Sequence, residues 1–130
     1  MDKSRNLIAK WYYKFISDLI RTAQKSIIII DNYIDDTVLV LLSKRKKNLD
    51  VTILTKTIYE QLALDVKKYN EQYPIINIGE FKNAHDRFII IDKKVIYHFG
   101  ASLKDLGKKW FACSKMDMEA TEMLARLKRE

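Results

Sequence analysis

Apolar residues recur along this chain at two different periods. From Asn6 to about Gln24 they return every three or four positions with charged residues between them, which predicts an amphipathic helix. Ser26–Ile30 and Val51–Thr55 are instead continuous runs rich in β-branched residues, as is typical of strands buried on both faces. The chain therefore predicts helices and strands in alternation.

Later segments continue the alternation and include a hairpin. We expect further helices at 37–43, 58–69 and 116–129, and further strands at 75–78, 86–91, 95–99 and 110–113. The turn Asp92-Lys93-Lys94 joins two of these strands, which makes them a hairpin. This order predicts the α/β class, with a mixed β-sheet flanked by helices on both faces.

Length and composition narrow the picture. A chain of 130 residues, 48% of them hydrophobic, fits a single domain (residues 1–130) with one core. The net charge of +7 favours a polyanionic partner such as nucleic acid, although a charge excess is also typical of a solvated face. Cys113 is the only cysteine, so the chain can form no internal disulfide. This cysteine usage favours the interior of a cell, so we expect a cytoplasmic protein. We find no signal-peptide core and no membrane-length apolar run, so we expect no stable membrane insertion.

One stretch combines reactive side chains with a strand. His85 and Arg87 lie two positions apart, at the start of an isoleucine run that ends in Asp92. In a strand their side chains point to the same face, which sets a nucleophile or base beside a cation able to grip phosphate. With 2 His, 24 Lys+Arg and 17 Asp+Glu, this spacing arises by chance about 0.05 times. The stretch indicates phosphoryl chemistry, and the structural alternative for His85 is a hydrogen-bonded histidine at a strand start.

These three residues fall on the fixed positions of H-x-K-x4-D, the signature of the phospholipase D superfamily, with arginine in place of lysine. From about Phe15 onward the expected elements also resemble one half of a phospholipase D-like enzyme. The resemblance implies that His85 attacks a phosphodiester to form a phosphohistidine, that Arg87 holds the charged oxygens, and that no metal or other cofactor is needed. Asp92 is the third catalytic candidate, and its alternative is a structural role at the start of the hairpin turn. With the positive charge, the resemblance implies a metal-independent phosphodiesterase, specifically a nuclease.

The family's active site needs two such signatures, and this chain carries one. His98 heads no second signature, because Gly100 stands where the cation belongs. The resemblance therefore implies a homodimer that pairs two copies of His85, as similar single-motif nucleases do.

The loop after the signature differs from the family pattern. Where the family has Gly-Ser-x-Asn, strict spacing gives Phe99-Gly100-Ala101-Ser102, so Ser102 stands at the asparagine position. Ser102 and Lys104 are the substrate-binding candidates in its place. The family's histidine-orienting acid follows that loop, and the nearest candidate here is Asp105.

Other segments resemble a second family. Ile30-Asp31-Asn32-Tyr33, Leu41-Leu42-Ser43-Lys44-Arg45 and the stretch 100–116 look like the C-terminal domain of phage-antirepressor-like DNA-binding proteins from bacteria. That resemblance implies a bacterial, phage-related protein with DNA as a partner. In that family the domain follows an N-terminal DNA-binding domain, so we expect this chain to be either a fragment of a longer protein or a stand-alone relative.

Two other functional hypotheses stay open. One is a catalytically degenerate phospholipase D-like domain that serves as a nucleic-acid-binding or dimerisation module. The other is a metal-dependent nuclease built on Glu80-Phe81-Lys82 with an upstream Asp. Acid-x-Lys patterns arise about 2.4 times by chance in this composition, so the second hypothesis has less support.

Polar and basic clusters flank the first helix after a strand. Residues 31–36 gather polar side chains just past a buried strand, where open α/β sheets bind their ligands. Asp35 or Asp36 is expected to cap the helix at 37–43. That helix finishes in Lys44-Arg45-Lys46-Lys47, which suits the negative end of a helix dipole, and a phosphate-binding patch is the alternative.

Overall fold

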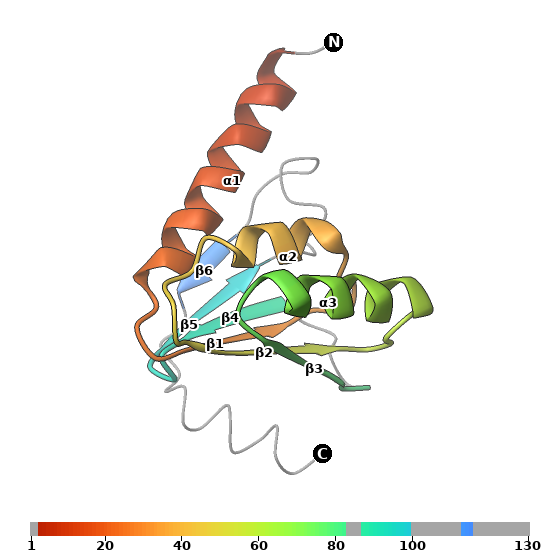
Figure 1. The fold of residues 1–130 in the computed structure, drawn as a ribbon. Coiled ribbons are helices and arrows are strands. Elements are labelled where there is room, and N and C mark those ends of the chain that lie inside the picture. Colours follow the sequence, from red (N-terminus) through yellow and green to blue (C-terminus); the bar gives the residue numbers. More distant parts are fainter. Residues whose placement is uncertain (1–2, 83–86, 100–112, 116–130) are drawn as a thin grey trace.

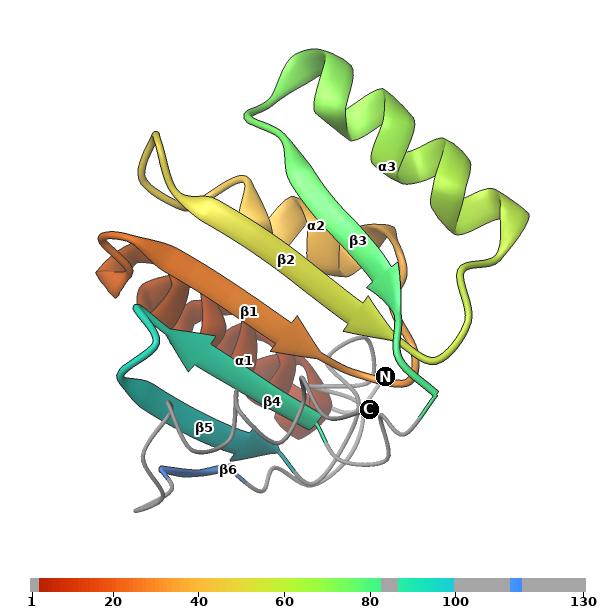
Figure 2. The same ribbon diagram turned by 90° about the horizontal axis from the view of Figure 1, so that it is seen from below.

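The computed structural model describes residues 3–82, 87–99 and 113–115, and a mixed six-stranded sheet forms its centre (Figures 1 and 2). The strand order across the sheet is β3-β2-β1-β4-β5-β6. The strands are β1 (Ser26–Ile30), β2 (Asp50–Thr55), β3 (Ile76–Glu80), β4 (Arg87–Ile91), β5 (Val95–Phe99) and β6 (Cys113–Lys115). The helices are α1 (Lys3–Thr22), α2 (Asp36–Leu42) and α3 (Glu60–Gln72). The predicted α/β class with a mixed sheet is confirmed.

Strand directions bring one end of each of the six strands to the same edge of the sheet. β1, β2 and β3 run parallel to one another, so their carboxyl ends lie together. β4 runs antiparallel to β1, and β5 antiparallel to β4. The first residue of β4 and the last of β5 therefore lie at the same edge. The first residue of β6 pairs with Phe99 and lies there too. We call this the carboxyl edge, and its strand-end residues are Ile30, Thr55, Glu80, Arg87, Phe99 and Cys113.

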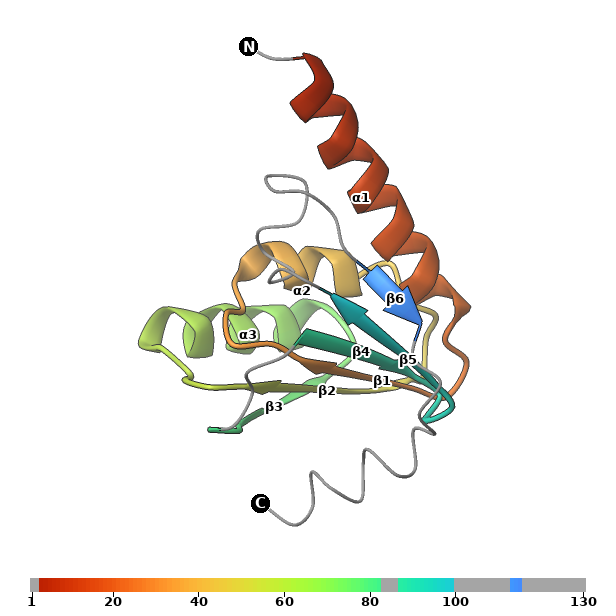
Figure 3. The same ribbon diagram turned by 180° about the vertical axis from the view of Figure 1, so that it is seen from behind.

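The three described helices all cover one face of the sheet, as Figures 1 and 3 show from opposite sides. Alternate residues of a strand point to opposite faces, and those on the helix-covered face pack against the helices in the main core. Its sheet residues include Ile27, Ile29, Val51, Ile53, Ile89 and Ile91. The other face carries a smaller cluster of Ile30, Ile90 and Ile96. The helix expected at 116–129 lies outside the described residues, so helices on both faces stay a prediction.

Helix α1 contributes to the core mainly through its C-terminal half. Ile16, Leu19 and Ile20 are buried there, and burial of each such side chain stabilises the fold by about 1.5–3 kcal/mol. Trp11 and Tyr13 are exposed, and Figure 1 shows the helix extending beyond the sheet. Within the described ranges, no helix is long and apolar enough to cross a membrane.

Two helix boundaries follow local chemistry. Asp35 caps α2, because its carboxylate accepts the backbone N–H of Thr37 at 3.1 Å, which confirms the predicted cap. α3 ends at Gln72, before Pro74 as predicted. It begins at Glu60, however, and the apolar Ile58 packs against the core from the preceding loop.

Arg45 lies inside the fold although it belongs to a basic run. Only 8% of it is exposed, and its guanidinium donates to the carbonyls of Leu42 (3.0 Å) and Pro74 and to the Tyr69 hydroxyl (2.5 Å). It also lies over the Tyr69 ring, 5.6 Å from the centroid. Arg45 therefore ties the end of α2 to the end of α3, and the phosphate-patch alternative is wrong for this residue. The three lysines of the run are exposed.

Candidate functional site

Arg87 opens β4 at the carboxyl edge. It shares the helix-covered face with Ile89 and Ile91, because these residues alternate along one strand. Its partner position on β5 is the fully buried Phe99. Arg87 is half-buried, and its Nε atom is shielded from solvent. The sheet therefore presents a guanidinium, with its apolar neighbours behind it, at the edge where α/β sheets bind ligands.

Asp31 is a completely buried carboxylate beside this position. It directly follows β1, and the registers pair Ile30 with Phe88 on one side and with Leu54 on the other. Continuing these registers by one residue sets Asp31 opposite Arg87, and its backbone N–H does donate to the Leu54 carbonyl at 3.0 Å. Burying a charged side chain costs free energy unless an opposite charge or hydrogen bonds compensate for it. A guanidinium at the adjacent strand position would therefore lower the free-energy cost of burying the Asp31 carboxylate.

Hydrogen bonds hold the Asp31 loop in place. The Asp31 carboxylate accepts the backbone N–H of Tyr33 at 3.1 Å. The Thr55 hydroxyl, at the end of β2, donates to the carbonyl of Asn32 at 3.2 Å. One of these hydrogen bonds lies within the loop after β1, and the other joins this loop to β2. Together they hold Asp31 at a defined position on the carboxyl edge.

Glu80, at the end of β3, ties a second loop to the sheet in a comparable way. Its carboxylate accepts the backbone N–H of Ile58 at 3.3 Å, which ties the end of β3 to the loop before α3. Lys56 and Lys82 follow β2 and β3 and are exposed. Within the described parts of the chain, no three His, Cys, Asp or Glu side chains lie close enough together to hold a metal ion.

Asp92 lies at the opposite end of β4 from Arg87. Its carboxylate accepts the backbone N–H groups of Gln24 (2.9 Å), Lys25 (2.7 Å) and Ser26 (3.1 Å), at the start of β1. Burial by itself raises the pKa of this carboxyl, but these N–H donors, together with the charge of Lys94, hold the pKa below its ordinary value. Asp92 also adopts a left-handed backbone conformation (φ 55°) in the turn. These hydrogen bonds and this backbone conformation support the turn-forming interpretation of Asp92, and its catalytic role stays a prediction.

His98 lies on the face opposite to Arg87. It pairs with Phe88 in the β4–β5 ladder, and the two rings lie 5.1 Å apart at 41°. His98 therefore belongs to the second face of the sheet. His85, Ser102, Lys104 and Asp105 lie outside the described residues.

No protein-family model and no curated protein sequence matches this chain. Solved structures do match it. NucT from Helicobacter pylori has a TM-score of 0.66 at 14% identity, over 93% of this chain and 87% of that one. Nuc from Salmonella typhimurium, a phospholipase D family member, has a TM-score of 0.66 at 16% identity, over 89% of this chain and 84% of that one.

A third match is TrmBL2, an archaeal chromatin protein with a novel mode of DNA binding. Its TM-score is 0.58 at 11% identity, over 93% of this chain and 48% of that one. Fold and site together define an α/β domain with a cation at the ligand-binding edge of a mixed sheet. More specifically, the fold of the chain is similar to that of Nuc, a phospholipase D family member, and to that of NucT.

Asp31 is the residue of this edge whose position the sequence analysis missed. The available signal was a carboxylate placed directly after the four isoleucines of β1. Its proximity to Arg87 depends on β4 pairing with β1, and these two segments are far apart in the sequence.

Proposed function

We propose that this protein is a metal-independent phosphodiesterase that cleaves nucleic acid through a phosphohistidine on His85. The observation that carries the proposal is the position of Arg87, which stands at the carboxyl edge two residues after His85. The structural similarity to NucT and Nuc supports a nuclease, and the net charge of +7 suits a polyanionic substrate.

The chemistry divides one difficult step into two. A nitrogen of His85 attacks phosphorus, the bond to the leaving oxygen breaks, and a second histidine gives that oxygen its proton. Water then attacks the phosphohistidine, the second histidine takes the proton from the water, and the phosphorus–nitrogen bond breaks. Arg87 binds two phosphate oxygens in a bidentate manner and stabilises the charge that grows on them in both steps.

Asp31 has a positioning role in this proposal. A carboxylate beside the guanidinium limits its rotation, so that the N–H groups of Arg87 face the phosphate. Ser102 and Lys104 provide further contacts to the phosphate, and Asp105 is the candidate acid that orients His85. These three roles rest on the sequence resemblance.

The second histidine comes from a second copy of the chain. One signature supplies one His85, and a two-fold symmetric dimer would bring two of them together in a single site. His98 does not serve this purpose, because it lies on the opposite face of the sheet from Arg87. The proposed enzyme is therefore a homodimer with one composite active site.

A catalytically degenerate nucleic-acid-binding or dimerisation module is the second candidate function. The similarity to TrmBL2, a chromatin protein that binds DNA, favours it. Arginine in place of the signature lysine and serine at the asparagine position also fit this alternative.

An activity screen separates the two candidates. Wild type, His85→Ala and the matched control His98→Ala are incubated in EDTA with single- and double-stranded DNA, RNA and a generic phosphodiester. We expect turnover by wild type and His98→Ala and none by His85→Ala. Activity that disappears in EDTA would contradict the metal-independent mechanism. If wild type shows no turnover and His85→Ala binds nucleic acid equally well, the binding module replaces the enzyme.

A further inference from the structure

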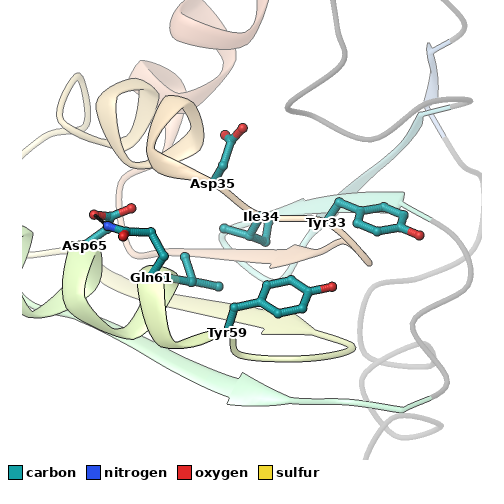
Figure 4. Close-up of a pocket in the computed structure, with 7 residues that line it drawn as sticks. Tyr33, Ile34, Asp35, Tyr59, Gln61 and Asp65 are labelled. Carbon is teal, nitrogen blue, oxygen red and sulfur yellow. Dashed lines mark hydrogen bonds between the residues drawn. The ribbon is translucent and has the colours of Figure 1, made fainter.

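A cavity opens between the loops that follow β1 and β2 (Figure 4). Its volume is about 230 Å³, and its lining comes from both loops and from α3: Tyr33, Ile34, Asp35, Tyr59, Gln61, Leu62 and Asp65. Both loops start at the carboxyl edge. Pockets that hold drug-sized ligands measure about 300–1,000 Å³, so this one suits a single ring system.

Two partly exposed tyrosines supply aromatic rings to the lining of the cavity. Tyr33 is 47% exposed and Tyr59 52% exposed, and Figure 4 shows their rings pointing to the same side from two separate loops. Tyr59 occupies the N-cap position of α3 but makes no capping hydrogen bond there. Ser, Thr, Asp and Asn are preferred at that position, so helix capping does not explain this tyrosine.

The polar lining consists mainly of hydrogen-bond acceptors. The Asp35 carboxylate accepts the N–H of Thr37, and Asp65 accepts a hydrogen bond from Gln61 at 2.9 Å. A carboxylate offers about four acceptor positions, so both retain acceptor capacity. Their charge repels phosphate, whereas Arg87 attracts it, so the two positions along the edge suit different parts of a nucleotide.

We propose that this cavity, the tyrosine pocket, receives an unpaired base of a single-stranded nucleic acid whose phosphate lies at Arg87. The phosphate part rests on the proposed function. An unpaired base has free ring faces to stack on Tyr33 and Tyr59, and an exocyclic amino group can donate to the carboxylates. In a duplex the ring faces are covered by neighbouring bases, so the pocket selects single strands.

The pocket and the phosphate position are close along the chain. Tyr33 follows Asp31 by two residues, so their Cα atoms lie within about 7 Å. Asp31 in turn lies opposite Arg87 by strand register. The backbone N–H of Tyr33 donates to the Asp31 carboxylate, which couples the base position to the phosphate position through one loop.

Binding measurements on the His85→Ala background test the pocket, because this variant does not consume the oligonucleotide under the proposed function. The probes are a short labelled single strand, its duplex, and an abasic strand of equal length. We expect Tyr33→Ala and Tyr59→Ala each to weaken single-strand binding about 5- to 150-fold and to leave duplex and abasic binding unchanged. The corresponding phenylalanine variants keep the ring and should keep the affinity. Tyr13→Ala removes a tyrosine of α1 that is 45% exposed, and this matched control should change nothing.

Two results would overturn the tyrosine pocket. One is single-strand affinity that both alanine variants retain, and the other is an equal loss on the abasic strand, which would indicate backbone rather than base contacts. Arg87→Ala separates this proposal from the proposed function. If Arg87→Ala weakens abasic binding while the tyrosine variants change nothing, the phosphate site stands and the pocket fails. If only the tyrosine variants weaken single-strand binding, the pocket stands and the phosphate site at Arg87 fails.

Discussion

At the scale of single residues, side chains of opposite charge type occupy neighbouring strand positions where β1 ends and β4 begins. Asp31 is completely buried, and Arg87 is half-buried at the adjacent strand position. Charges interact more strongly at such partly desolvated positions than in water. The two residues are therefore expected to act as one unit, and variants of each test this differently.

Arg87→Ala should lower kcat/KM by about 10²–10³, because one charge contact to the transition state is lost. Arg87→Lys should retain part of the activity, since lysine supplies the charge without the bidentate geometry. Steady-state kinetics on a phosphodiester measures both, with Arg21→Ala on the exposed surface of α1 as the control. Wild-type activity in Arg87→Ala would exclude this residue from the site.

Asp31→Asn keeps the size of the side chain and an acceptor for the Tyr33 N–H, but removes the charge. We expect a decrease of about tenfold or more in kcat, with a smaller change in KM. In the Arg87→Ala background the same substitution should have little further effect, because its partner is already absent. Additive losses in this double-mutant cycle would show that Asp31 acts independently of Arg87.

At the scale of elements, the β4–β5 hairpin is attached to the rest of the sheet at its turn. The Asp92 carboxylate accepts three backbone N–H groups, two from the loop before β1 and one from Ser26, the first residue of β1. The backbone N–H of Asp92 donates to the Ser26 carbonyl at 2.8 Å. This attachment joins segments separated by 66–68 positions in sequence. The turn therefore contributes to the stability of the sheet.

Asp92→Ala should reduce the free energy of unfolding by about 1–3 kcal/mol, because three donors lose their acceptor and alanine disfavours the left-handed backbone. Asp92→Asn keeps an acceptor and tolerates that backbone, so its loss should be smaller. Urea unfolding measures both. If Asp92→Ala has wild-type stability and no activity, the catalytic interpretation of Asp92 is the right one.

The contribution of Asp92 to the free energy of unfolding should decrease as the pH falls. The pKa of Asp92 is lowered in the folded protein, so its contribution is complete above the ordinary carboxyl pKa of about 3.9 and is lost as the pH falls toward the folded value. The stability difference between wild type and Asp92→Asn should therefore shrink below about pH 4. A difference that stays constant through this range would contradict the lowered pKa.

Sequence patterns predicted most elements because their signals are local. Four consecutive isoleucines in β1 indicate a buried strand without further information. The start of α3 was placed two residues early, because Ile58 has helical spacing but packs on the core from a loop. Arg45 resembled a solvated cation, and its burial depends on Tyr69 and Pro74, which come later in the chain. Such contacts depend on tertiary structure and leave no local pattern.

Only the part of the candidate site that has a local sequence pattern could be predicted. His85 and Arg87 belong to one signature, which spacing alone reveals. The proximity of Asp31 requires knowing that β4 pairs with β1 rather than with β3, its neighbour in sequence. The tyrosine pocket likewise requires the loops after two parallel strands to meet.

At the scale of the whole molecule, the proposed function needs two copies of the chain. Sedimentation velocity at micromolar concentration should show a homodimer, because each active site needs a histidine from both copies. Mixing active protein with excess His85→Ala should lower the activity per active chain, since mixed dimers lack one histidine. A strictly monomeric protein with full activity would contradict the composite site.

Arg87 and Asp92 lie at opposite ends of β4, so the number of residues between them determines which face and which end of the sheet each side chain reaches. Five strand residues at about 3.3 Å each span about 16 Å, one passage across the sheet. Deleting one residue between Phe88 and Ile91 would preserve every reactive group yet turn one strand end to the wrong face. Either Arg87 would leave the helix-covered side, or Asp92 would lose its three N–H donors. The number of residues between Arg87 and Asp92 is therefore fixed by the length of β4, because each of the two residues must lie at its own end of this strand.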